Sequence, residues 1–311
     1  MQDSLNTNDY QRDYELAQSG GYFNLSDWGV IGIEGPDSKD FLQRLSTVNL
    51  KTMEDGQLAP GAFLTGRGTV VVIGNLLRVH SERYLWMTAP NQRQLSLEHF
   101  EKFHFQEQLV VKDCSENYAL VAFWNKKPLD LQNAWVDAWR PSLYWHFFDR
   151  HQQIEKFQNW EAQGLARLGM QLFHFFRVQA GVPWLGWEIS ESDLVLEAGL
   201  DKAVARNKGC YPGQEVVERI FTYGQVNKKL LRVSAELTTT GVSQVPDLEI
   251  SRGAEKMGQL KSILVHPQKP AQGVGLAYIK KNFWEHDEAV QISPSVRVRW
   301  YNSSSEVLTH D

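Results

Sequence analysis

The stretch "NKGCYPGQEVVERI", residues 207–220, holds one of only two cysteines in a chain of 311 residues. Gly209 precedes Cys210, and Tyr-Pro-Gly follows it. The Pro212-Gly213 pair predicts a type II turn, in which the glycine supplies the positive φ angle. The run "QEVVERI" that follows is compatible with a short helix or a strand, and a helix would bring its positive end close to the sulfur.

Two interpretations of Cys210 remain open at this point. Lys208 and Arg206 are close in sequence, and cations beside a thiol favour the thiolate, which indicates a reactive or ligand-binding cysteine. Alternatively, Cys210 is a small buried residue at a tight turn. The sequence contains no C-x-x-C or C-x-x-H pair, so no metal site is predicted. We expect the second cysteine, Cys114, to be structural.

Composition restricts the class of protein. Apolar residues make up 42% of the chain and charged residues 22%, as in ordinary globular proteins. A net charge of −5 argues against a protein that coats nucleic acid. Two cysteines cannot form a disulfide framework, which favours a reducing compartment, and we expect the cytoplasm. No long apolar run predicts a membrane span. The polar, acidic residues 1–20 are expected to be a leader, partly helical or frayed.

The pattern of apolar residues along the chain predicts an α+β fold. We expect strands and helices in succession up to residue 124, with Gly66-Arg67-Gly68 forming a hairpin turn and Asn91 capping a helix. The predicted strands cover 21–35, 56–65, 69–80, 83–89 and 108–124, and the predicted helices cover 36–50 and 91–105.

The rest of the chain changes character near residue 226. Before it, we expect a helix over 126–139, a strand over 142–150 and a helix that Gly181 and Pro183 terminate. After it, short strands separated by glycines predict a small antiparallel barrel over 226–311.

The segment "KGCYPGQE", residues 208–215, resembles the K-G-C-Y-x-G-Q-E signature of the YgfZ-type family. These folate-binding proteins support iron–sulfur enzymes and tRNA modification, and they are related to the glycine-cleavage T-protein, an aminomethyltransferase. Residues 26–50, 176–183, 194–204 and 218–233 are also similar to family segments. The resemblance implies a T-protein-like folate-binding body of two interlocked subdomains over 21–225, followed by the barrel.

The resemblance also implies site residues and a cofactor, tetrahydrofolate or a derivative. Trp28 matches a tryptophan that lines the folate site, although it could be an ordinary strand aromatic. Phe173 falls where the family can carry a tryptophan facing the ligand, and its alternative is core packing. Glu197 matches a glutamate that hydrogen-bonds the pterin ring, and its alternative is a solvated helix-start residue. Cys210 would be the working thiol, and Lys208 would favour its anionic form.

Two further features bear on function. Leu95 stands near the place where the aminomethyltransferases have an aspartate, and a leucine cannot accept a proton. Whether the chain is an enzyme therefore stays open. Basic residues outnumber acidic ones between Gly199 and Ala235, which suits a folate tail, an RNA phosphate, an acidic partner or simply a solvated face. These basic residues are Lys202, Arg206, Lys208, Arg219, Lys228, Lys229 and Arg232.

The leading expectation is a folate-binding accessory protein for iron–sulfur cluster assembly or repair. Through iron–sulfur enzymes it would influence tRNA modification. One alternative is a folate-dependent one-carbon (aminomethyl) transferase, and a second is a tRNA-binding module. We expect a monomer whose partners are folate and iron–sulfur enzymes or assembly proteins, and direct contact with tRNA is left open.

Overall fold

A computed structural model describes residues 7–301, apart from residues 129, 130, 132, 225, 239–246 and 287. The chain separates into two compact units. The first comprises the residues up to Met170 together with Asp201–Glu218, and the second comprises Gln171–Leu200 and the residues from Arg219 onward. Residues 171–200, which we expected in the folate-binding body, thus cluster with the strand-rich C-terminal part.

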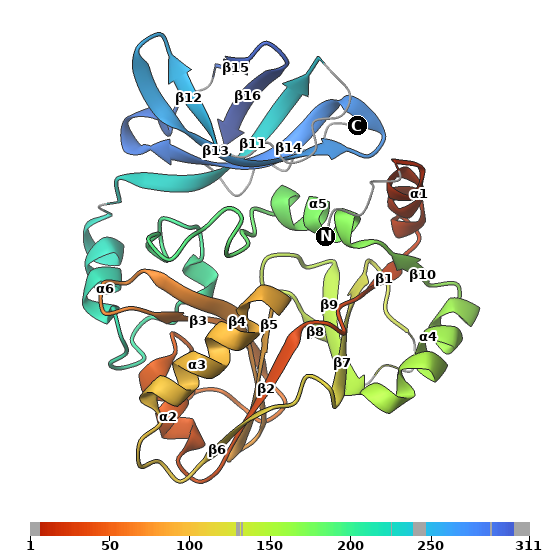
Figure 1. The fold of residues 1–311 in the computed structure, drawn as a ribbon, viewed down its shortest axis with the longest axis vertical. Coiled ribbons are helices and arrows are strands. Elements are labelled where there is room, and N and C mark those ends of the chain that lie inside the picture. Colours follow the sequence, from red (N-terminus) through yellow and green to blue (C-terminus); the bar gives the residue numbers. More distant parts are fainter. Residues whose placement is uncertain are drawn as a thin grey trace. The chain divides into compact units, whose positions relative to one another are not determined.

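One sheet of the first unit has the strand order β10-β1-β7-β9-β8 (Figure 1). Its strands are β1 (Gly21–Asn24), β7 (Tyr118–Trp124), β8 (Trp135–Val136), β9 (Leu143–Asp149) and β10 (Ala166–Leu168). Strands β1 and β10 run parallel, and the other neighbours are antiparallel. Helix α4 (Gln153–Ala162) contributes Phe157 and Trp160 to an apolar core with residues of β1, β7 and β9.

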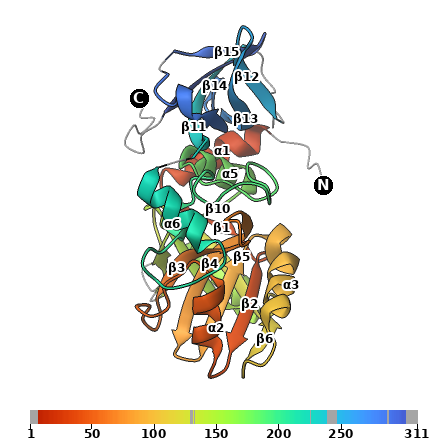
Figure 2. The ribbon, with the colours of Figure 1, turned by 90° about the vertical axis from the view of Figure 1, so that its left-hand side faces the viewer.

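The other sheet of the first unit is antiparallel, with the order β3-β4-β5-β2-β6. Its strands are β2 (Gly29–Glu34), β3 (Leu58–Leu64), β4 (Val70–His80), β5 (Arg83–Thr88) and β6 (Val110–Asp113). Helices α2 (Ser38–Leu45) and α3 (Arg93–Phe103) cover one face of this sheet (Figure 2). The buried side chains of both helices join the core of that face, because their apolar residues recur at helical spacing.

Helix α1 (Thr7–Ala17) shows that most of the predicted leader is part of the first unit. Tyr10 and Ala17 are buried, the Asn125 side chain donates a hydrogen bond to the Ala17 carbonyl, and the Asp13 carboxylate accepts one from the Gly169 N–H. Of the two expectations for residues 1–20, partly helical or frayed, the helical one describes residues 7–17, while residues 1–6 lie outside the described part of the chain.

The second unit contains the predicted barrel, a nearly closed antiparallel sheet with the order β12-β13-β14-β11-β16-β15 (Figure 1). Its strands are β11 (Lys228–Leu237), β12 (Leu248–Arg252), β13 (Glu255–His266), β14 (Lys269–Lys280), β15 (Val290–Ser293) and β16 (Val296–Tyr301). Helix α5 (Met170–Gln179) packs on the barrel, with the rings of Phe175 and His266 5.5 Å apart. Helix α6 (Gln214–Tyr223) continues from one unit into the other.

Several local predictions are corrected. The expected single strand over 21–35 is two strands, β1 and β2, which belong to different sheets because the Asn24 side chain accepts hydrogen bonds from Ser26 and turns the chain. The described residues of 126–139 contain strand β8 and no helix. Asn91 lies in a short 3-10 helix (Pro90–Gln92), and Gln92 occupies the N-cap of α3. Within the described residues, no helix is long and apolar enough to cross a membrane.

Candidate functional site

The loop that carries Cys210 has the predicted turn. The Gln214 N–H donates to the Tyr211 carbonyl at 3.2 Å, and Gly213 at the third position has φ +80°, as a type II turn requires. Gly209 and Asn207 also have positive φ, of +99° and +58°. The run "QEVVERI" forms the start of helix α6, which resolves the choice between helix and strand.

Lys208 anchors this loop from inside the first unit. Its side chain is 1% exposed, and its ammonium donates to the backbone carbonyls of Gln43 at 2.5 Å and Ser46 at 2.6 Å, at the C-terminal end of helix α2. A cation suits the negative end of a helix. Burial, together with a smaller effect of the Lys51 charge, lowers the pKa of Lys208 to about 8. The ammonium bonds two carbonyls and so anchors the loop, and the proposed effect of the Lys208 charge on the Cys210 thiol stays a prediction.

Gln43 completes the attachment, and sequence reasoning missed it. Its side-chain amide donates to the Lys208 carbonyl, while its side-chain oxygen accepts the Leu50 N–H at 2.7 Å. Gln43 and Lys208 therefore bond each other in both directions. The available signal was a glutamine between two buried positions of an amphipathic helix, Leu42 and Leu45.

Gly213 lets the loop dock on the hairpin between β3 and β4. A Cβ atom on Gly213 would lie 2.6 Å from the Thr65 carbonyl oxygen and 2.7 Å from the Gly68 Cα. On the other side, the hairpin's Gly68 has φ +78° and faces Val216 of α6. Only glycine allows the two backbones to approach so closely.

Cys210 is an exposed residue of this loop, as are Asn207 and Gly209. Its neighbour Tyr211 is buried, with the Lys208 ammonium 4.8 Å from the ring centre, and burial raises the pKa of Tyr211 to about 12. The Lys208 charge also interacts with Cys210, whereas Arg206 lies 3.9 Å from Glu218. The residues on both sides of Cys210 are thus fixed, and the alternative of a buried cysteine is wrong.

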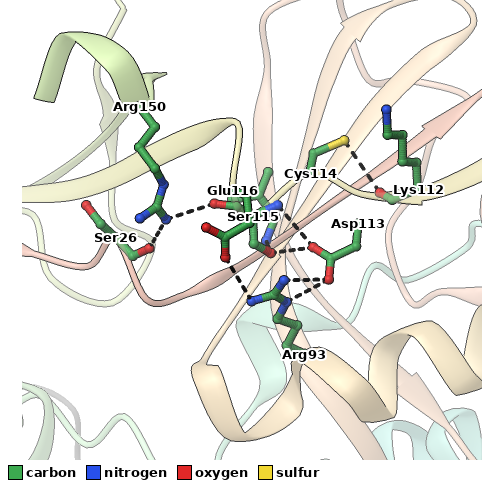
Figure 3. Close-up of polar contacts among 9 residues, drawn as sticks. Ser26, Arg93, Lys112, Asp113, Cys114, Ser115, Glu116 and Arg150 are labelled. Atoms are coloured by element: carbon green, nitrogen blue, oxygen red, sulfur yellow. Dashed lines mark hydrogen bonds and ion pairs between the residues drawn. The ribbon is translucent and has the colours of Figure 1, made fainter.

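The turn that carries Trp28 lies elsewhere in the first unit and is held from two directions (Figure 3). Arg150 donates to the carbonyls of Ser26 and of Ser115, the latter at 2.8 Å. The Ser115 hydroxyl accepts the Val30 N–H at 3.0 Å. The chain around Trp28 is therefore clamped to the turn between β6 and β7.

The clamp continues to the start of helix α3 (Figure 3). The Asp113 carboxylate accepts the hydroxyl of Ser115 at 2.6 Å and the Arg93 guanidinium at 2.7 Å. These contacts hold the Asp113 carboxyl in its charged form and lower its pKa, against the effect of burial. Between them, the half-buried Cys114 thiol donates to the Lys112 carbonyl at 3.5 Å, which is compatible with a structural cysteine.

The Trp28 ring itself is 8% exposed. It lies 5.3 Å from the ring of Trp145, whose N–H donates to Asp137 at 2.8 Å, and Asp137 pairs with Arg140 in a buried ion pair at 3.1 Å. The indole is thus held in a fixed position and is almost fully buried.

Leu95 packs against the apolar core of the α2–α3 face. Its side chain is therefore part of the core, and the preceding Arg93 is held by Asp113. The structure provides no carboxylate at Leu95 that could act as a base.

The remaining two predicted site residues belong to the second unit. Phe173 is 1% exposed, and its ring packs edge-on against Trp184 at 6.5 Å, so the core alternative describes it. Glu197 is 6% exposed, which excludes the solvated alternative. One of its oxygens accepts the Asn227 N–H at 3.3 Å, and burial together with the charge of Asp193 raises the pKa of Glu197.

An exposed tryptophan near Phe173 was missed. Trp187 is 39% exposed, lies 4.5 Å from the ring of His174 and stands over the buried Arg177 guanidinium at 5.1 Å. Arg177 in turn pairs with the fully buried Glu188 at 2.8 Å. The tryptophan-rich "PWLGWE", residues 183–188, was the available signal.

The basic residues between 199 and 235 do not form one free surface. Lys208 is buried, and others are engaged within their own unit: Lys202 with the Ala138 carbonyl, Lys228 with Asp193 at 2.5 Å, Lys229 over the Trp284 ring and Arg232 with the Gln179 carbonyl. The solvated-face interpretation therefore fits only part of the set. Among the described residues, no cluster of histidine, cysteine and carboxylate side chains could hold a metal ion.

The fold and part of the sequence of this chain are similar to those of known proteins. The crystal structure of the glycine cleavage system aminomethyltransferase T from Bartonella henselae superimposes with a TM-score of 0.78 and 15% identity, covering 94% of this chain and 88% of that one. The chain has the T-protein fold. A family model described as the GCVT N-terminal domain matches residues 11–131.

Sequence relatives of this T-protein-like chain agree with the fold. It is 26% identical to an aminomethyltransferase of Rubrobacter xylanophilus, over 83% of this chain and 76% of that protein. It is 23% identical to the tRNA-modifying protein YgfZ of Cronobacter sakazakii, over 67% and 69% of the two chains. It also matches a chloroplastic protein of Arabidopsis thaliana at 24% identity, and it spans 65% of that protein's length.

Proposed function

We propose that this T-protein-like protein binds a reduced folate and assists the assembly or repair of iron–sulfur clusters, with Cys210 as its working thiol. The observation that carries the proposal is the loop of residues 207–213. The loop is held in place by Lys208, Tyr211 and Gly213, whereas Cys210 is exposed. A loop so strongly attached around one reactive group is the arrangement expected of a functional site. The similarity to YgfZ supports the same reading.

The residues proposed to contact folate fit such a ligand. Trp28 offers a fixed indole, a flat apolar ring of the kind that packs against another flat ring. As a separate proposal within the second unit, the buried carboxyl of Glu197 is able to hydrogen-bond ring N–H donors of a folate. Phe173 is core and is not part of the proposal. A bound folate would supply one-carbon chemistry, and this chain's own groups would bind and orient it.

The number of cysteines limits how Cys210 could take part in iron–sulfur cluster assembly. A [4Fe–4S] cluster takes four thiolate ligands, and the described chain has two cysteines, of which Cys114 bonds a backbone carbonyl inside the clamp. Cys210 therefore supplies one ligand or one nucleophile to a cluster that a partner protein holds. Effects on tRNA modification would follow from the iron–sulfur enzymes that the protein serves.

Two variants test this proposal. Cys210→Ser should abolish support of an iron–sulfur methylthiotransferase, read as methylthiolated tRNA in cells whose own copy is deleted, while tetrahydrofolate binding stays within about twofold. Cys114→Ser is the matched control and should retain support. Trp28→Ala should weaken tetrahydrofolate by about 1–3 kcal/mol, by analogy with base–aromatic stacking, while Trp28→Phe keeps most of the affinity. Wild-type levels of methylthiolated tRNA in cells carrying Cys210→Ser would contradict the proposal.

Aminomethyl transfer is the second candidate, favoured by the relatives that carry that name. Incubation of the protein with methylene-tetrahydrofolate and candidate amines decides between the two. We expect no turnover, because Leu95 offers no proton acceptor. A tRNA-binding module is a weaker candidate, since Lys228 and Arg232 are already engaged. Absence of measurable tRNA binding at low salt would exclude it.

A further inference from the structure

Strands β11 and β16 are neighbours in the sheet of the second unit (Figure 1). Their side chains, with Ala289, line a groove on the sheet. The groove has a volume of about 170 Å³. It is lined by Ser234 and Glu236 of β11, by Ala289, and by Arg297, Arg299 and Tyr301 of β16. None of these residues belongs to the loop of Cys210 or to the turn of Trp28.

The groove forms because side chains along β11 and β16 point alternately into the barrel and outward. In β16, Val296, Val298 and Trp300 point into the barrel core, so the three residues between and after them point outward. The antiparallel register sets Ser234 opposite Arg299 and Glu236 opposite Arg297. Two arginines at alternate positions of one strand therefore share one outer face, and they are positioned by rigid sheet.

The charges in the groove do not cancel. Arg297 lies 3.7 Å from the Glu236 carboxylate. Arg299 is exposed and, within the part of the chain that the structure describes, makes no ion pair. One glutamate thus faces two guanidinium groups, which leaves a net positive charge in the groove.

A hydroxyl pair adds a donor. The hydroxyls of Ser234 and Tyr301 are 3.0 Å apart and share one hydrogen bond. Two hydroxyls have two hydrogens, and a bond between them uses one, so the other can point to a ligand. A guanidinium fork with an adjacent hydroxyl donor is the donor set that binds a tetrahedral oxyanion.

We propose that this groove binds a phosphate group. The volume is below the roughly 300 Å³ at which pockets begin to enclose a whole small ligand, so the groove takes the phosphate and the atoms next to it. A nucleotide or a nucleic-acid backbone could carry the group. The site is independent of the proposed folate and thiol function, because it shares no residue with either.

Calorimetric titration of the full chain at low ionic strength tests the proposal with adenosine monophosphate, a short RNA oligonucleotide and adenosine. At least one phosphate-bearing probe should saturate, and adenosine should not. Arg299→Gln should weaken that probe about 10- to 100-fold, the range expected for a lost charge-assisted hydrogen bond. Glu236→Gln should tighten it. The probe that depends on Arg299 identifies whether a nucleotide or a nucleic acid supplies the phosphate.

Arg252→Gln is the matched control, because Arg252 is an exposed barrel arginine of β12 that pairs with Glu288 at 3.2 Å. It should leave the affinity unchanged. Tetrahydrofolate binding should also be unaltered in Arg299→Gln, which separates this site from the proposed function and shows that the variant is folded. Equal affinity of the wild type and Arg299→Gln for every probe, or no saturation by either phosphate-bearing probe, overturns the inference.

Discussion

Replacing Lys208 by methionine probes the anchor of the Cys210 loop directly. Methionine keeps an unbranched apolar stem but removes the ammonium that donates to the carbonyls of Gln43 and Ser46. Each carbonyl left without a donor in a buried place costs about 1–3 kcal/mol, so the two together cost about 4 kcal/mol. Against this, the variant no longer buries a charge.

The cost of that buried charge follows from the pKa of Lys208, which burial lowers from 10.5 to about 8. The difference corresponds to about 3 kcal/mol at neutral pH. Lys208→Met should therefore be less stable than the wild type by only about 1 kcal/mol at pH 7. Between pH 8 and pH 10.5 the unfolded chain binds more protons at this lysine than the folded one, so wild-type stability rises with pH relative to the variant. The difference should approach about 4 kcal/mol.

Urea unfolding at several pH values measures the difference in free energy of unfolding between the wild type and Lys208→Met. Titratable groups that both proteins share do not contribute to this difference. Lys202→Met is the control, because its ammonium also donates to a carbonyl, that of Ala138, but from an exposed position. It should change the free energy of unfolding by less than about 0.5 kcal/mol at every pH. A Lys208→Met difference that stays constant from pH 7 to pH 10 would show that the ammonium is not desolvated and would refute the reasoning.

Three other substitutions test the surroundings. Gly213→Ala should lose about 2–4 kcal/mol of unfolding free energy because of its positive φ and the close hairpin backbone, whereas Gly224→Ala, with φ +62° and open space, should lose about 1 kcal/mol. Burial lowers the pKa of His99 to about 4, so the free energy of unfolding of the wild type falls as pH decreases from 6.5 to 4. In thermal melts, the free energy of unfolding of His99→Phe should fall by about 3 kcal/mol less than that of the wild type over this pH range. Glu188→Gln should cost about 3–5 kcal/mol in denaturant unfolding, because it leaves a buried guanidinium without its charge partner; a loss below about 1 kcal/mol would contradict that.

Local signals were sufficient where a structure is decided within a few residues. The Pro212-Gly213 pair predicted a type II turn because only glycine takes the third position without strain. Short strands separated by glycines predicted a small antiparallel barrel after residue 226, and β11 to β16 form it. Both are confirmed, and the barrel follows from several such strands.

The remaining features depend on partners far away in the sequence. Alternation continues through residues 21–35, but Asn24 turns the chain and the halves pair with different neighbours, β7 and β5. Lys208 stands two residues from Cys210, which suggested a role at the thiol, yet its acceptor Gln43 is 165 positions away. Distance along the chain to a reactive residue does not tell whether a lysine points toward it or into the core.

Most residues of the signature around Cys210 therefore determine the conformation of the loop. Lys208 binds the end of α2, Gly209 and Gly213 supply backbone angles closed to other residues, and Tyr211 fills the interior. A sequence could retain all of these and keep the loop with any small residue at position 210. The Cys210 thiol is then not required by the loop shape, and the exposure of Cys210 is a reason to assign it a chemical task rather than a structural one.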